Sequence, residues 1–241
     1  MEIALKEVSG SFHPLQMTFT RFLAGGLFLI PFAVRTLKKK KASLNWKDLP
    51  GFLLLGFVGM VLSMSIYQMS VKEVPASVVA VLFSSNPIFT AVLAFFMLKE
   101  PIRRNQIAAL LLEIGGILAI INPFHTSLSP YGVLLAMIST LLFAVYGVMG
   151  KRRCARFGGV VVTCASFLCG GAEMLFMILF SRLPMVNKWL AGSGLELFAN
   201  IPLLSGYSWN TLPWMLMICI INTGLGFACY FKAMEETSAQ E

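Results

Sequence analysis

Long, uninterrupted runs of apolar residues follow one another along this chain, separated by short polar segments. A helix of about 20 residues crosses a hydrocarbon core of about 30 Å, and several of the runs reach that length. They show no alternation with a period of two, which excludes the lipid-facing strands of a β-barrel. We therefore predict an all-α membrane protein, a polytopic helical bundle. The predicted spans are 49–71, 74–98 and 128–150 without charge, 14–34, 105–121 and 158–180 with one charge each, and a seventh between 212 and 231.

The chain carries the same helical pattern twice. The segment 46–50 (Trp-Lys-Asp-Leu-Pro) recurs at 209–213 (Trp-Asn-Thr-Leu-Pro), an offset of 163 residues. The segment 22–26 (Phe-Leu-Ala-Gly-Gly) returns at 167–171 (Phe-Leu-Cys-Gly-Gly), an offset of 145, and the order of the two blocks is kept. An internal duplication in a very apolar chain is the usual build of a secondary transporter, whose substrate site lies between the copies.

The duplication divides the chain into two predicted repeats. Residues 1–123 form the first repeat, from the end of helix one to helix five, and residues 124–241 form the second, from helix six to the start of helix nine. The offsets place the front of the first helix before Met1 and the last two helices beyond Glu241. We therefore expect an intact relative to have ten spans, five per copy, and this chain to be truncated at both ends. Because five is odd, the second copy enters the membrane from the opposite side.

Composition and charge placement agree with a membrane protein and argue against nucleic acid as a partner. Hydrophobic residues make up 57% of the chain and charged residues 12%, against about 45–50% and about 25% in soluble domains. The net charge is +8, yet 14 of the 19 Lys and Arg residues fall in alternate loops and only four in the opposite loops. This asymmetry follows the positive-inside rule. We predict a multi-pass protein of the inner (plasma) membrane of a bacterial cell, in contact with the lipid bilayer.

The chain lacks the sequence patterns of catalytic and metal sites. Its five cysteines form no Cys-x-x-Cys pair, and neither histidine has a carboxylate or cysteine at ligand spacing, so we predict no metal and no cofactor. His-Glu-x-x-His, Gly-x-Ser-x-Gly and Walker-type motifs are absent. These absences argue against an enzyme and against transport driven by nucleotide hydrolysis within this chain. A gradient is the remaining energy source.

Motifs along nearly the whole chain resemble those of EamA-type members of the drug/metabolite transporter superfamily. The most specific run is 74–101, which combines a proline entry, a mid-span Asn-Pro and a Lys-Glu-Pro exit. The matching positions are His13-Pro14, Arg21, Tyr67, Pro75-Ala76-Ser77, Asn86-Pro87, Lys99-Glu100-Pro101, Gln106, Gly116 and Asn122-Pro123. The resemblance implies a ten-helix inverted-repeat carrier of small polar metabolites, with a central cavity faced by helices one, three, four, six, eight and nine. Glu113 departs from the pattern, so the resemblance implies no role for it.

The fourth helix carries the first group of candidate substrate-binding residues. Pro87 removes a backbone donor near mid-span, so we expect a kink there that leaves the carbonyl of Phe83 without its usual partner. Ser84, Ser85, Asn86, a neighbouring helix or water must satisfy carbonyls that are freed in this way. These polar groups are either substrate contacts or the internal bonds of a packing kink, and both interpretations stay open.

A second group of polar residues lies at similar depth on other helices that the resemblance places around the cavity. We predict that these residues bind substrate: Ser63 and Tyr67 on the third helix, Tyr146 on the sixth, and Asn222 and Tyr230 on the eighth. Tyr67 and Tyr230 are repeat equivalents, so a pseudo-twofold axis would place them at opposite mouths of the cavity. The alternative is that both belong to the aromatic belts at the membrane interfaces.

Three charged residues lie inside the predicted spans, where a charge costs about 2.5–3.5 kcal/mol at the bilayer centre. Arg21 and Glu173 enter from opposite sides and reach a similar depth, so we predict a structural ion pair between them. Glu113 lies near mid-depth on the fifth helix and is the better candidate for proton coupling by burial alone. The alternative for Glu113 is a neutral, hydrogen-bonded acid at a helix interface.

We predict a secondary-active transporter that exports or imports small polar metabolites by alternating access at the interface of the repeats. A channel would need a continuous polar stripe or rings of charge, which the sequence lacks. The alternatives left open are a channel-like or non-transport membrane protein and an inactive fragment of a transporter. The identity of the substrate, the direction of transport and the coupling ion have no sequence signal, and a homodimer is left open.

Overall fold

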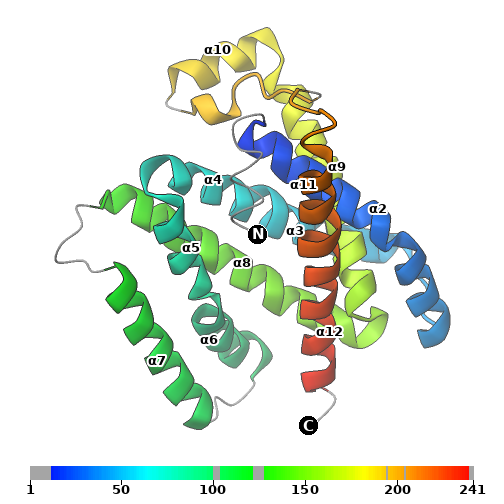
Figure 1. Ribbon diagram of the computed structural model, residues 1–241. Coiled ribbons are helices and arrows are strands. Elements are labelled where there is room, and N and C mark those ends of the chain that lie inside the picture. The colour runs from blue at the N-terminus through cyan, green and yellow to red at the C-terminus, as the bar shows by residue number, and fades with distance from the viewer. Residues whose placement is uncertain (1–11, 100–103, 122–127, 194, 204, 239–241) are drawn as a thin grey trace. The chain divides into compact units, whose positions relative to one another are not determined.

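The computed structural model describes residues 12–99, 104–121, 128–193, 195–203 and 205–238, and the regular elements in these ranges are all helical (Figure 1). The predicted all-α class is therefore confirmed. In chain order the elements are α2 (Pro14–Lys40), η1 (Trp46–Asp48), α3 (Leu49–Gly56), η2 (Phe57–Ser63), α4 (Met64–Glu73), α5 (Ala76–Ser84), α6 (Asn86–Leu98), α7 (Arg104–Ile121), α8 (Pro130–Phe157), α9 (Gly159–Ser181), α10 (Pro184–Gly192), η3 (Glu196–Phe198), α11 (Leu212–Leu216), η4 (Met217–Leu225) and α12 (Gly226–Ser238).

Six continuous helical stretches in the described ranges are long and apolar enough to cross a membrane. They are Pro14–Lys40, Trp46–Glu73, Ala76–Leu98, Pro130–Phe157, Gly159–Ser181 and Leu212–Ala233. Each coincides with a predicted span, and the span predicted at 105–121 corresponds to helix α7. The chain is therefore a polytopic helical membrane protein.

The helices form two compact packing units. Unit 1 holds residues 1–61 and 150–241, and unit 2 holds residues 62–149. The packing units follow contacts, whereas the predicted repeats follow sequence similarity, so unit 1 contains helices from both predicted copies. The repeat boundary at residue 123 stays a prediction.

Unit 1 is built around helices α2 and α9, which pack along one another. Phe22 and Phe167 are fully buried at their contact, with ring centroids 5.0 Å apart. Phe227 of α12 completes the cluster, with its ring centroid 5.1 Å from that of Phe167. Burial of Phe22 and Phe167, together with the edge-to-face contacts that both rings make with the half-buried Phe227, stabilises this helix crossing.

The loop before α11 is fastened to the N-terminal part of α2. The buried Gln16 amide donates hydrogen bonds to the carbonyls of Leu203 (3.2 Å) and Ser205 (2.8 Å), and the Ser205 hydroxyl donates to Gln16 Oε1 (3.1 Å). The hydroxyls of Thr20 and Tyr207 lie 2.7 Å apart, at hydrogen-bonding distance. The Gln16 side chain thus supplies hydrogen bonds to backbone carbonyls of this loop, which lack the partners that a helix or strand would provide.

Two of the membrane-spanning stretches change locally from α-helix to π-helix. These π-helical segments are η2 in the stretch Trp46–Glu73 and η4 in the stretch Leu212–Ala233. An offset of 163 maps 217–225 onto 54–62, which overlaps η2. A π-helical turn bonds residue i to residue i+5 and leaves the helix locally wider, and such turns occur frequently at functional sites.

Unit 2 packs α4, α5 and α8 around a small apolar core. Val74, Val79, Leu82 and Ala136 are buried together at its centre. The Ser70 hydroxyl donates a hydrogen bond of 2.7 Å to the carbonyl of Gly132, which joins α4 to α8.

Candidate functional site

The membrane-spanning stretch Ala76–Leu98 is broken at Ser85, which confirms the kink predicted from the proline that follows. Helix α5 ends at Ser84 and α6 begins at Asn86, while Ser85 has φ −69° and ψ 2°. The Ser84 hydroxyl donates to the carbonyl of Val81 and the Ser85 hydroxyl to that of Leu82, each at 2.6 Å. Both serines therefore satisfy backbone carbonyls of their own helix, as the packing interpretation requires.

The side chains at the break differ in exposure. Ser85 is buried, Ser84 is exposed and Asn86 is half-buried. Asn86 Oδ1 accepts a hydrogen bond of 3.5 Å from Thr90 Oγ1, one turn further along α6. Hydroxyls that already donate to the backbone can still accept a hydrogen bond from a solute, because each oxygen keeps a lone pair.

Ser63 is engaged in a reciprocal contact between two helical stretches. Its buried hydroxyl donates to the carbonyl of Ser139 on α8 (2.9 Å), and the Ser139 hydroxyl donates back to the carbonyl of Ser63 (2.8 Å). This pair joins the end of the π-helical segment η2 to α8. The structure therefore gives Ser63 a packing role, and its predicted role in substrate binding stays a prediction.

Two of the predicted binding residues belong to one chain of aromatic rings in unit 2. Tyr67 of α4 meets Phe83 of α5 edge-to-face at a centroid distance of 5.2 Å. Phe83 then meets Phe143 of α8 at 5.1 Å, and Phe143 meets Tyr146 at 5.5 Å. Sequence reasoning predicted Tyr67 and Tyr146 but missed the two phenylalanines between them, because no spacing within one helix reveals a contact across three helices.

The two predicted residues of the eighth helix lie in unit 1. Asn222 is half-buried in the π-helical segment η4, and its Nδ2 is buried without a hydrogen-bond partner in the described ranges. Tyr230 is half-buried on α12, with its ring 5.3 Å from that of Phe231. A buried amide donor without a partner is costly unless a bound group accepts its hydrogen bond.

The predicted ion pair between Arg21 and Glu173 is not formed. Glu173 Oε2 is buried, and no hydrogen bond or salt bridge joins the carboxyl group to any described residue. Arg21 is buried, and its guanidinium carbon lies 4.7 Å from the centroid of the Phe22 ring. The sequence prediction of their partnership was therefore wrong.

The pairing of α2 with α9 puts Arg21 and Glu173 at the same level, but the two side chains point in different directions around their helices. Gly171 faces α2, because a Cβ there would lie 3.6 Å from Leu23. Two further residues along α9 turn the side chain by about 200°, so Glu173 points away from α2. Arg21 lies one turn before Gly25, which faces η4 and not α9.

Glu113, the third predicted intramembrane charge, belongs to helix α7. Its side chain lies outside what the structure describes. Its proposed role in proton coupling stays a prediction.

Glycines of the repeated Gly-Gly pairs approach neighbouring helix backbones closely in unit 1. A Cβ at Gly170 of α9 would lie 2.7 Å from Cβ of Met60 and 3.2 Å from Cα of Gly56, the last residue of α3. A Cβ at Gly25 of α2 would lie 3.1 Å from the carbonyl oxygen of Cys219 in η4. Only glycine permits so close an approach of helix backbones. The repeated Gly-Gly pair in the sequence was the signal that could have predicted these contacts.

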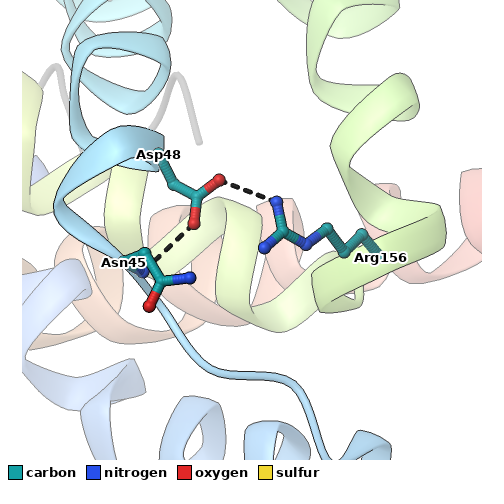
Figure 2. Close-up of polar contacts among 3 residues, drawn as sticks. All are labelled: Asn45, Asp48 and Arg156. Atoms are coloured by element: carbon teal, nitrogen blue, oxygen red, sulfur yellow. Dashed lines mark hydrogen bonds and ion pairs between the residues drawn. The ribbon is translucent and has the colours of Figure 1, made fainter.

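Basic side chains gather where the C-terminal ends of α2 and α8 meet. Lys40 Nζ donates to the carbonyl of Cys154 (3.4 Å), and Arg156 Nη1 forms a salt bridge of 2.8 Å with Asp48 Oδ1 (Figure 2). The other oxygen of Asp48 accepts from the backbone N–H of Asn45 (3.1 Å), as Figure 2 also shows. Asp48 therefore caps the start of the Trp46–Glu73 stretch and neutralises part of the positive charge.

Comparisons with known proteins agree with the helical architecture. The profile of the EamA-like transporter family matches residues 2–122 and 130–241. A protein of Clostridium kluyveri named an uncharacterized transporter is 30% identical over 236 residues, which cover 95% of this chain and 70% of that relative. The uncharacterized inner membrane transporter YedA of Escherichia coli strain K12 is 27% identical over 243 residues, which cover 90% of this chain and 75% of YedA.

A solved crystal structure is also similar to this chain. It aligns with 97% of this chain and 80% of its own chain, with a TM-score of 0.57 and 20% sequence identity, which indicates a shared fold. The family profile covers nearly the whole chain, and both of these relatives bear transporter names. The chain therefore belongs to the EamA-like transporter family and is a membrane transporter.

Proposed function

We propose that this transporter is secondary-active and moves small polar metabolites across the inner (plasma) membrane by alternating access between two inverted repeats. The observation that carries the proposal is a set of helix contacts in unit 1 that occur in equivalent pairs. A transporter built in this way has its substrate site at the interface of the repeats. It performs no catalysis and draws its energy from a gradient.

The first pair of contacts joins α2 to α9. A Cβ at Gly26 would lie 3.0 Å from Leu168, and a Cβ at Gly171 would lie 3.6 Å from Leu23. The offset of 145 maps Gly26 onto Gly171 and Leu23 onto Leu168. Exchanging the two copies therefore turns one contact into the other, which is the behaviour expected of a twofold axis.

The direction of this pairing supports inversion. Along α2 the residue number rises from Leu23 to Gly26, while the partners on α9 fall from Gly171 to Leu168. The two helices are thus antiparallel, and an axis that exchanges them must be perpendicular to both. For membrane-spanning helices such an axis lies in the plane of the membrane, which is the arrangement of inverted repeats.

The second pair of contacts involves the glycines described above. Gly170 of α9 meets Gly56 of α3, and Gly25 of α2 meets Cys219 of η4. Gly25 and Gly170 are equivalent at the offset of 145, and Gly56 and Cys219 are equivalent at 163. Two independent offsets therefore relate the same two interfaces, which supports a common axis for both.

Interrupted helices support a substrate site near mid-span. The break at Ser85 and the π-helical segments η2 and η4 loosen regular backbone hydrogen bonding inside the apolar spans. Irregular backbone at that depth is tolerated where it is buried in protein or lines a cavity. We propose that the polar residues of unit 2 beside these breaks, Ser63 and Asn86, contact the substrate. Tyr67 and Tyr146 would supply aromatic surface with a hydroxyl group.

Orientation offers the first test of the repeat arrangement. The hydrogen bond from Lys40 to the carbonyl of Cys154 brings the C-terminal ends of α2 and α8 together. In a cysteine-free background, single cysteines at Lys40 and Arg152 should therefore react with a membrane-impermeant maleimide from the same side of the membrane. Labelling from opposite sides would contradict the inverted repeat.

Transport is tested with a library of small polar metabolites. Compounds that raise the unfolding temperature of the purified full chain are then offered to proteoliposomes, with empty liposomes as the control. Tyr67→Phe should weaken the response to a transported compound, whereas Tyr131→Phe, at an exposed position on α8, should not. The proposal fails if no stabilising compound is taken up faster than by empty liposomes, or if the two substitutions have the same effect.

A further inference from the structure

Glu173 is an acid deep inside a span, and its carboxyl group has no partner among the described residues. It lies eight residues from Ser181, the last residue of α9, or about 12 Å along the helix at 1.5 Å per residue. Its side chain is half-buried, and Oε2 is buried without a hydrogen-bond partner in the described ranges. An acid in this position marks a functional site by default, because an unpaired charge is costly within a membrane.

The surroundings of Glu173 supply no described cation that could keep it charged. On α9 itself Cys169 lies one turn before it. The side of α9 that carries Glu173 is the side on which Gly170 meets Gly56 and Met60, which bear no charge. On α2, Arg21 lies at the same depth but on the face toward η4.

The other predicted copy has an apolar residue at the equivalent position. The offset of 145 maps Glu173 onto Phe28, whose ring Cδ1 would lie 3.5 Å from a Cβ at Gly224 in η4. Glu173 therefore occupies the position at which the other copy packs a phenylalanine against a π-helical segment. The acid at 173 therefore makes the contacts of α9 differ from the equivalent contacts of α2. Apolar packing alone does not explain why an acid occupies this position.

We propose that Glu173 binds the coupling proton of the transport cycle, a proposal that rests on the function proposed above. In the step we infer, the carboxylate takes up one proton and becomes a neutral carboxylic acid, and it releases the same proton when the other side of the membrane becomes accessible. The neutral form fits the packed contact of α9 with α3 and η2. The charged form favours the state in which water reaches the carboxyl group.

The first test needs no substrate. The apolar carbodiimide dicyclohexylcarbodiimide adds to a protonated carboxyl group within a membrane, and the product rearranges to a stable N-acylurea. We expect one adduct on the purified full chain, mapped by mass spectrometry to Glu173. Once the pH exceeds the pKa of the group, the labelled fraction should fall about tenfold per pH unit. Glu173→Gln should abolish this adduct, and Glu196→Gln, at an exposed position of η3, should keep it. Absence of an adduct at Glu173 at every pH would overturn the proposal.

The second test uses a transported compound from the library. Uptake by the parent chain should rise when a pH gradient is imposed, and Glu173→Gln should lose that dependence while it still responds to the compound in thermal unfolding. Glu196→Gln is the control at an exposed acid and should keep the dependence. Equal dependence on the pH gradient in Glu173→Gln and the parent would refute proton binding at Glu173 and leave the transporter intact. Absence of uptake by the parent would refute the proposed function instead, and the carbodiimide result would still decide whether Glu173 binds a proton.

Discussion

Replacing Gly56 by alanine tests the backbone contact between α3 and α9. A Cβ at this position would lie 2.5 Å from the backbone nitrogen of Gly170, 2.8 Å from its Cα and 3.1 Å from the carbonyl carbon of Cys169. These are backbone atoms, which cannot rotate aside, so the overpacking cost should lie near the upper end of its range, about 3 kcal/mol. Alanine in place of glycine within a helix returns about 1 kcal/mol. We therefore expect Gly56→Ala to lower the free energy of unfolding by about 2 kcal/mol.

The matched control is Gly171→Ala, one position beyond Gly170 on the same helix. Its Cβ would lie 3.6 Å from Leu23, an ordinary contact that adds no steric cost. Only the higher helix propensity of alanine should then affect stability, and the free energy of unfolding should rise by about 1 kcal/mol. For a chain of this size, a loss of about 2 kcal/mol corresponds to roughly 4–8 °C in the unfolding midpoint. Tryptophan fluorescence during heating in detergent measures both variants. Equal midpoints for Gly56→Ala and Gly171→Ala would refute the close contact.

Three further changes probe other contacts. Ser63→Ala should cost about 0.6 kcal/mol, the mean for interhelical hydrogen bonds in membranes, and the double variant with Ser139→Ala should cost more; no loss in the double variant would contradict the reciprocal pair. Asp48→Asn should cost no more than about 1 kcal/mol, because its partner Arg156 is largely exposed, and the salt dependence of the parent's unfolding midpoint should be weaker in the variant; unchanged salt dependence would speak against the ion pair. Gln16→Leu should remove the bonds to two carbonyls, cost about 2 kcal/mol and expose the segment 201–208 to limited proteolysis, whereas parent-like cleavage would show that the segment is held by other contacts.

The fold class and the spans could be predicted because both depend on quantities that run along the chain. The length of an apolar run decides whether it crosses a membrane. The kink at Ser85 could also be predicted, because Pro87 acts on the turn immediately before it. The π-helical segments could not be predicted, since a π-helical turn differs from an α-helical turn by one residue and leaves no pattern in the apolar positions.

The candidate site was predicted only in part, because its members are joined across helices. Tyr67 and Tyr146 were recognised as polar aromatic residues at suitable depth, but the rings of Phe83 and Phe143 connect them. Ser63 was predicted to bind substrate, and its hydroxyl donates a hydrogen bond to the carbonyl of Ser139 on α8, a contact that the sequence did not indicate. The neighbour that a side chain contacts depends on how the helices pack. The periodicity of a single sequence does not reveal that packing.

Arg21 and Glu173 do not pair although they lie at the same level. The level of a residue along its helix and the direction of its side chain around the helix axis are separate quantities. Depth follows from counting residues at 1.5 Å each, and the contact of Gly171 with Leu23 puts the two charges at the same level. Direction changes by about 100° per residue, so an ion pair requires both helices to present the right face. Gly25 lies on the same face of α2 as Arg21, and this face contacts η4. Gly171 contacts α2, and Glu173 lies on the opposite face of α9.

In the proposed inverted repeat, two identical halves would make the inward-open and outward-open states equal in free energy. Positions at which equivalent structures differ in charge would therefore make the two states unequal. Asn45 and Asp48 cap the start of one helical stretch, and Ser208 and Thr211 make the equivalent reciprocal bonds at the start of the other. The capping is therefore shared, while the negative charge of Asp48 and its bond to Arg156 occur in one copy only. Glu173 differs from its equivalent, Phe28, in the same way. If the repeats are inverted as proposed, the residues that differ in charge between the two copies distinguish the two sides of the membrane.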